Sequence, residues 1–129
     1  MSGAGEALES AAAAAVRATG LAVFTGPPVQ ASEPYAVVEI GPVADWGHKS
    51  NAGREVRLSV TLWVRGERPA ALHGLMDAAE GALAGLGAAE GWQLVSLQLV
   101  RSRTVPPRNA SPEARWAGVL DYRARMLRA

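Results

Sequence analysis

The stretch REVRLSVTLWVR, residues Arg54–Arg65, is the most regular part of the chain. Apolar residues alternate strictly with other residues, which is the period of a β-strand that buries one face. The first face consists of Val56, Leu58, Val60, Leu62 and Val64, and the second of Glu55, Arg57, Ser59, Thr61, Trp63 and Arg65. The pattern predicts a strand with one face in the core. A tryptophan on the other face needs an explanation, because a large aromatic side chain is rarely left in water.

Periodicity on either side of this strand predicts five further elements. They are a helix over residues 5–18 that stops at Gly20, a strand over Tyr35–Val43, a helix from Pro69 to Leu86, and strands over Gly91–Val105 and Arg115–Leu127. Two hairpins joined by a crossover helix give an α+β fold, with a four-stranded, mainly antiparallel sheet and two helices packed on one face. The helices can cover only one side, so we expect the side with Trp63, Arg123 and Arg125 to meet solvent or a partner.

Three details of the strands are also predicted. Gly41 and Pro42 end the first strand or place a bulge in it. The segment Thr25–Pro34 holds three of the eight prolines, which excludes it from the centre of a sheet and makes it a loop. The two faces of Gly91–Val105 are less distinct than those of Arg54–Arg65, so we expect partial burial on both sides of that strand.

Composition limits the class of protein. A chain of 129 residues with 49% hydrophobic content has the size at which one core forms, so we expect a single domain over residues 1–129. The chain has no cysteine, which removes disulfides, thiolate metal sites and cysteine nucleophiles and favours a reducing compartment. Glu6 and Glu9 precede the first basic residue, Arg17, so we expect a soluble protein with no signal peptide and no membrane span.

Charge is distributed unevenly along the chain. The net charge of +1 argues against a general nucleic-acid binder. Residues 101–129 carry seven arginines and two acidic residues, which gives +5, whereas residues 1–100 sum to −4. Arg101 with Arg103, and Arg123 with Arg125, alternate along predicted strands. Such residues most often form the solvated face of an edge strand, which their charge protects from aggregation.

Motifs for catalysis are scarce. The two histidines, His48 and His73, lack the spacing of a zinc site, and no glycine-rich phosphate loop or nucleophile elbow is present. Asp45 beside His48 could form an acid–base pair, but a loop aspartate that accepts hydrogen bonds from nearby backbone amides is the commoner arrangement. We therefore expect no enzyme activity, no metal site and no cofactor.

The segment DWGHKSNAGREVRLSVTLWVRG, residues Asp45–Gly66, resembles the signature of the small tail terminator (tail-completion) proteins of long-tailed phages and of phage-derived gene transfer agents. An Asp-Trp pair, a nearby lysine, Gly-Arg-Glu and a strand that ends in an aromatic follow one another in that order. The short N-terminal helix, the proline just before the strand at Tyr35, the crossover helix and the closing GVLDYRARM strand extend the resemblance over nearly the whole chain. A common family variant has serine or threonine at the position of His48, so the resemblance assigns that residue no role.

The resemblance implies a structural virion protein. Such a protein forms a ring, usually of six copies, at the head-proximal end of the tail tube. There it ends tube polymerisation and docks to head-completion (stopper) proteins while DNA passes through the ring. The implied partners are further copies of the chain, the tail tube protein and a head-completion protein, with DNA only in transient contact. The implied location is the virion tail, after assembly in the host cytoplasm.

Two groups of residues are candidates for these contacts. The subunit or tube interface is expected to use Asp45, Trp46, His48, Lys49, Arg54, Trp63 and Arg65. The basic residues expected at the lumen or an interface are Arg101, Arg103, Arg123 and Arg125. We expect those arginines to serve mainly protein contacts, paired with carboxylates such as Glu55 or Asp121, because tight phosphate binding would slow the passage of DNA. Trp63 could equally be covered within its own chain, by the C-terminal tail or by the 25–34 loop.

Three alternatives stay open. The first is another connector of the virion neck, such as a head-completion protein, which shares the size and the ring assembly. The second is an α+β domain that binds a small ligand through the loop around His48. The third is a DNA-binding protein that uses the basic C-terminal part of the chain.

Overall fold

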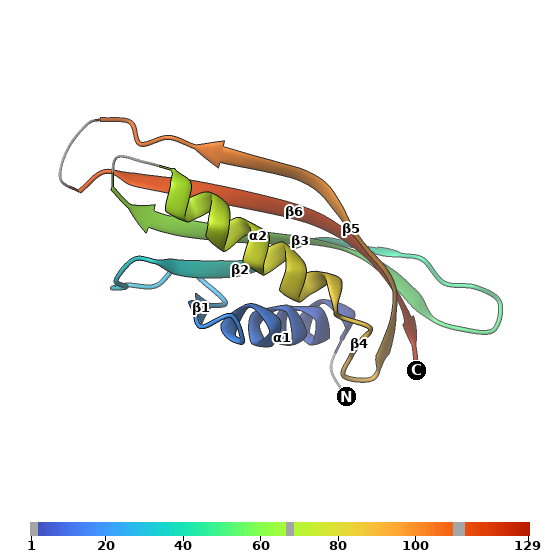
Figure 1. The fold of residues 1–129 in the computed structure, drawn as a ribbon. Coiled ribbons are helices and arrows are strands. Elements are labelled where there is room, and N and C mark those ends of the chain that lie inside the picture. Colours follow the sequence, from blue (N-terminus) through green and yellow to red (C-terminus); the bar gives the residue numbers. More distant parts are fainter. Residues whose placement is uncertain (1–2, 67–68, 110–112) are drawn as a thin grey trace.

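The computed structural model describes residues 3–66, 69–109 and 113–129. Two helices and six strands follow one another along the chain: α1 (Ala4–Arg17), β1 (Ala22–Phe24), β2 (Tyr35–Asp45), β3 (Gly53–Arg65), α2 (Ala70–Ala84), β4 (Ala88–Ala89), β5 (Trp92–Val105) and β6 (Arg115–Arg128). The strands form one sheet in the order β1-β2-β3-β6-β5-β4 (Figure 1). The pair β1–β2 is parallel and the other four pairs are antiparallel.

The predicted α+β class with two helices on one face of the sheet is confirmed, but the four-stranded sheet is wrong. The four expected strands are present as β2, β3, β5 and β6, with 11 to 14 residues each. A short strand lies at each edge, β1 with three residues and β4 with two. Strands of this length are too short to show an alternating pattern, so periodicity could not reveal them. The sheet is mixed because β1 runs parallel to β2.

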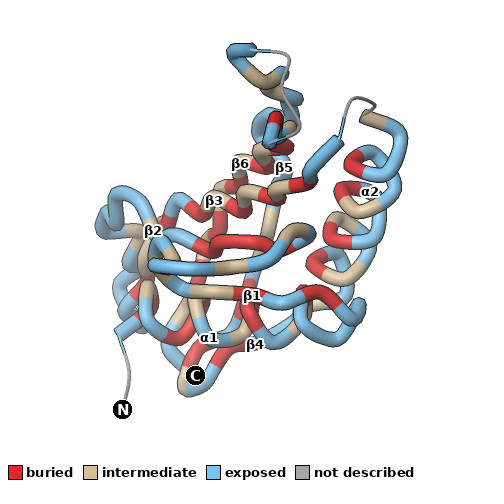
Figure 2. The backbone as a smooth tube through the Cα atoms, turned by 90° about the vertical axis from the view of Figure 1, so that its left-hand side faces the viewer, coloured by how far each residue is buried: buried red, intermediate tan, exposed pale blue. Residues whose placement is uncertain are grey.

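The core lies between the helices and one face of the sheet. Every second residue of β3 from Val56 to Val64 is buried, and β6 alternates in the same way from Leu120 to Met126. Leu8 of α1 and Leu72 of α2 pack against this face and are fully buried. Buried residues follow the strands and the helix sides turned toward them (Figure 2). The strict period of two in both central strands therefore marks the face that the helices cover.

The two helices pack closely on the sheet because several residues at the contact are small. In α1 the alanines at 4, 7, 12 and 13 are buried, so the helix lies close to β2. Alanine also has the highest helix propensity, and Gly20, with φ +96°, follows the end of the helix. In β6, Gly118 lies directly beneath α2, where a Cβ atom would stand 2.5 Å from the sulfur of Met76. The close packing of α2 on the sheet therefore depends on that glycine.

Strand β5 differs from its prediction. Trp92 and Leu94 are buried, whereas Val95, Leu99 and Val100 are exposed. Partial burial on both sides is thus wrong for most of the strand, because α2 packs chiefly on β6 and β3, and β4 pairs only with the first two residues of β5. The register with β6 shifts around Val95 and Val100, which marks two bulges on this sheet edge. In β2 the register shifts between Ile40 and Val43, so the glycine-proline pair makes a bulge and does not end the strand.

Candidate protein interface

The polar segment of the sequence forms the tip of the β2–β3 hairpin, which projects beyond the helices (Figure 1). The Trp46 N–H donates a hydrogen bond to the Gly53 carbonyl at 3.0 Å, and the His48 N–H donates to the Asn51 carbonyl at 2.9 Å. The Asn51 side-chain amide donates to the carbonyl of Arg128 at 3.2 Å. Backbone and side-chain bonds therefore hold the tip in one conformation and tie it to the end of β6.

Aromatic and charged side chains of the tip contact one another. The rings of Trp46 and His48 meet edge to face with centroids 5.0 Å apart, and the guanidinium of Arg125 lies 5.6 Å from the Trp46 ring. Arg54 pairs with Asp45 at 3.2 Å, although the Asp45 side chain is 83% exposed. Asp45 also accepts a hydrogen bond from the backbone N–H of Gly47, also at 3.2 Å. This is the backbone contact expected for a loop aspartate.

The face of the sheet opposite the helices is strongly charged. We call it the bare sheet face. Its charged members, which the strand register places on one side, are Glu39, Glu55, Arg57, Arg65, Arg101, Arg103, Arg115, Asp121, Arg123 and Arg125. The Nε atoms of Arg123 and Arg125 each lie 3.5 Å from the same Glu55 oxygen. For Arg125 this is a charge contact only, because its Nε makes no hydrogen bond to a described group.

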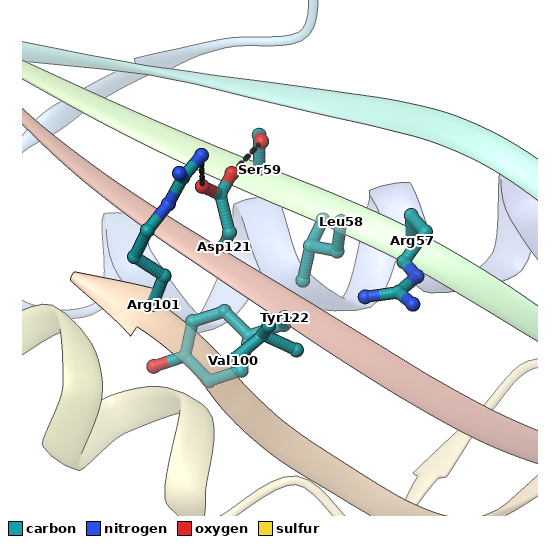
Figure 3. A pocket seen from close by; sticks show the side chains of 7 residues that line it. All are labelled: Arg57, Leu58, Ser59, Val100, Arg101, Asp121 and Tyr122. Atoms are coloured by element: carbon teal, nitrogen blue, oxygen red, sulfur yellow. Dashed lines mark hydrogen bonds and ion pairs between the residues drawn. The ribbon is translucent and has the colours of Figure 1, made fainter.

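Asp121 is the second acidic centre of this face. Ser59 Oγ donates a hydrogen bond to Oδ1 of Asp121 at 2.5 Å, and the Arg101 guanidinium contacts Oδ2 at 3.3 Å (Figure 3). The hydrogen bond from Ser59, followed by those from Arg101 and the charges of Arg101 and Arg103, holds the pKa of Asp121 below its ordinary value despite partial burial. The structure therefore pairs three of the four predicted arginines, Arg101, Arg123 and Arg125, with the two predicted carboxylates, and it does so within one chain.

Two arginines of this face, Arg57 and Arg103, form no ion pair with a described group. Arg57 is exposed and stands directly across from Arg123 in the β3–β6 register. Among residues 3–66, 69–109 and 113–129, none forms an ion pair with Arg57. It lines a hollow of about 430 Å³ together with Ser59, Arg101 and Asp121 (Figure 3). Arg123 and Arg125 also lie on a central strand, so the edge-strand interpretation applies only to Arg101 and Arg103 on β5.

Trp63 lies at the far end of β3 from the hairpin tip. It is half-buried and lines a cavity of about 240 Å³ with Pro27 and Pro28, so the 25–34 loop lies beside it. Glu33 anchors that loop. Its carboxylate contacts Arg65 at 3.2 Å and Arg115 at 3.6 Å, and its side chain is only 5% exposed.

The structure therefore divides the predicted interface residues. Asp45, Trp46, His48, Lys49 and Arg54 gather at the hairpin tip, whereas Trp63 and Arg65 lie together at the opposite end of the sheet. Of the two covers considered for Trp63 within its own chain, the 25–34 loop is the one that lies next to it. Sequence reasoning missed Glu33 and Arg115, since a single acid in a proline-rich loop gives no signal of its distant partners.

The histidines do not meet. His48 is at the hairpin tip and His73 is exposed on α2. Within the described ranges, no three His, Cys, Asp or Glu side chains are grouped as a metal ion requires. Neither helix of the described part is long and apolar enough to cross a membrane. The tip and the bare sheet face expose arginine and aromatic side chains, which are residue types enriched in protein interfaces.

Comparison with known proteins gives two matches. A family model described as "Tail completion protein gp17" matches residues 6–127. A chain of a solved structure described as "Virion of native gene transfer agent (GTA) particle" is 26% identical to this chain, with a TM-score of 0.73, and the match covers 98% of this chain and 99% of that one. No curated protein sequence matches significantly.

Proposed function

The chain belongs to the family of tail completion protein gp17, and from this premise we propose that it forms a ring at the head-proximal end of a tail tube and ends tube polymerisation. The family match over residues 6–127 is the observation that carries the proposal. The similar chain in the virion of a gene transfer agent supports a place in a virion. In this role the ring docks to a head-completion protein on its other side, and DNA passes through it.

The hairpin tip gives this function a structural basis. A contact surface works best when its side chains are held before the partner arrives, because less conformational entropy is then lost on binding. Trp46 is held by Arg125 and His48, and the backbone of the tip is tied to β6. Lys49 and His48 remain exposed at its end. We assign the contact with the tube or with the next subunit to this tip.

The role requires no chemistry. A ring that ends a tube acts by binding, and Glu55 and Asp121 of the bare sheet face already hold arginines in ion pairs. We therefore propose that the protein is not an enzyme and uses no cofactor. Its arginines stand among carboxylates, so contact with DNA in the lumen is transient and independent of sequence.

Polymerisation of purified tail tube protein tests this function. With the wild-type chain present, we expect tubes of limited length that carry a ring-shaped cap in electron micrographs, and a mass of the capped end that gives the number of copies. Tubes that grow as long with the chain as without it would overturn the proposal. A chain that binds only completed tails or heads would be a neck connector instead.

A charge-reversed variant tests the role of the tip. Lys49→Glu removes an exposed cation from the tip and should fold normally but lose capping. Arg108→Glu makes the same change of charge in an exposed loop outside the tip and serves as the matched control. Equal capping by both variants would show that the tip is not the contact.

A further inference from the structure

The two layers of the molecule carry opposite charge. The helix α2 contains Asp77 and Glu80 and no lysine or arginine, and α1 contains Glu6, Glu9 and Arg17. The helix layer therefore carries −3. The bare sheet face has seven arginines against three carboxylates, and with Glu33 of the adjoining 25–34 loop this side carries +3. The two outer surfaces of one chain are thus complementary to each other.

Arg57 and Arg103 of the bare sheet face form no ion pair with a described group, and of these two only Arg57 stands directly across from another arginine. Its cross-strand neighbour is Arg123, and like charges directly opposite on two strands destabilise a sheet. The nearest acidic residue of its own strand, Glu55, already contacts both Arg123 and Arg125. A local conflict of this kind, on an exposed and ordered surface, indicates a partner that supplies the missing negative charge.

The same surface is poorly suited to a nucleic acid. Glu39, Glu55 and Asp121 stand among its arginines, and a run of phosphates laid across the strands would meet those carboxylates. A protein surface with two or three carboxylates at defined positions avoids this repulsion. The charge pattern therefore favours a protein partner over DNA.

The outer side of α2 has the required properties. Asp77 is exposed and Glu80 is half-buried, and both line a hollow of about 310 Å³ between α2 and β5, which Arg103 of β5 also lines. The other outward residues of the helix include Ala71, Gly74, Ala78 and Gly81, all of them exposed. No long side chain among these four keeps a neighbouring surface at a distance, so an arginine from a flat sheet can reach the carboxylates.

We propose that α2 of one copy covers the bare sheet face of the next, with Arg57 of one copy paired to Asp77 and Glu80 of its neighbour. The inference rests on the proposed function, in which copies of this chain form a ring. The contact joins two different surfaces, so each copy offers one to either side and the chain of contacts can close on itself. A stable interface of this kind buries on the order of 1,200–2,000 Å².

The test is charge reversal and exchange in the full chain, with assembly measured by native mass spectrometry of the free protein and of protein bound to tail tubes. Arg57→Glu should raise the concentration needed for ring formation at least tenfold. The melting temperature of the unassembled Arg57→Glu chain should stay equal or rise, because Arg123 gains an opposite charge across the strands. Arg108→Glu, with the same change of charge, should assemble as the wild type does.

The exchange variant shows whether the two surfaces meet. A chain with Arg57→Glu, Asp77→Arg and Glu80→Arg should recover ring formation, whereas Asp77→Arg with Glu80→Arg alone should not form rings. Normal rings of Arg57→Glu, or loss of rings that the exchange does not restore, would overturn this contact and leave the capping function standing. A wild-type chain that forms no ring even on tail tubes would overturn both.

Discussion

The contact between α2 and the sheet makes a quantitative prediction at Gly118. In the Gly118→Ala variant, the added methyl group would lie 2.5 Å from Sδ and 2.9 Å from Cγ of Met76, and 3.0 Å from Cδ1 of Leu72. Ordinary contacts of a Cβ atom begin at 3.4 Å, so the helix must move away by up to about 1 Å or Met76 must change its rotamer. Overpacking of this kind in a well-packed core costs about 1–3 kcal/mol.

This free-energy cost predicts a decrease in the melting temperature. A chain of 129 residues has an unfolding entropy of about 270 cal/mol/K near its midpoint, so 1–3 kcal/mol corresponds to a decrease of about 4–11 °C. Differential scanning calorimetry at one protein concentration measures it, with the concentration fixed because assembly would itself raise the midpoint. In the double variant, Met76→Ala should remove most of the effect of Gly118→Ala, because the shortened side chain no longer meets the new methyl group.

Gly74→Ala is the matched control. It makes the same change on the outer side of α2, where nothing lies within 4 Å of the new methyl group. Alanine is the better helix former by about 1 kcal/mol, so this variant should raise the midpoint by about 2–4 °C. The two chemically identical substitutions are therefore expected to shift the melting midpoint in opposite directions. A Gly118→Ala chain as stable as the wild type would refute the packing described for α2.

Two further predictions concern the charged groups. Asp121→Asn should lower the free energy of unfolding at neutral pH. The pKa of Asp121 is lower in the folded chain, so its contribution to stability is present above the unfolded pKa and is lost as the pH falls through the folded pKa. The wild-type and variant chains should therefore become equally stable in strong acid. A difference in urea titrations that does not change with pH would contradict this. Glu33→Gln leaves Arg65 and Arg115 without their buried partner and should cost about 1–3 kcal/mol, seen as a lower urea midpoint with an unchanged slope; an unchanged midpoint would mean that Glu33 does not anchor the loop.

The elements that the sequence predicts well are those whose environment is the same along their length. Strand β3 has helices on one side and the bare face on the other from Val56 to Val64, so its pattern translates directly into burial. Strand β5 begins under cover and ends as an open edge, so Val95 and Leu99 are exposed although their residue types indicate burial. The residue pattern of β5 does not indicate how much of the sheet α2 covers. The prediction of partial burial on both sides of β5 failed for this reason.

Some features of the candidate site could likewise be predicted from the sequence, and others could not. The pairing of arginines with Glu55 and Asp121 could be predicted, because alternation places these residues on one face of neighbouring strands. The separation of Trp63 from the hairpin tip also follows from the length of β3, which puts residues 54 and 63 near its two ends. The role of Glu33 could not be predicted, since its partners are joined to it only through the register of β3 with β6.

The bare sheet face is exposed to water in the free chain and covered by another copy in the proposed ring. Its charges are compatible with both states. In the free chain, Glu55 and Asp121 each hold arginines, so each of these carboxylates already has an opposite charge beside it when a partner covers the face and displaces water. Two copies that met through this same face would bring Arg57 toward a second positive surface, which disfavours a symmetric pair. A contact with the acidic α2 of another copy has no such repulsion. The charges therefore select a head-to-tail contact between unlike surfaces, and that is the geometry from which a closed ring is built.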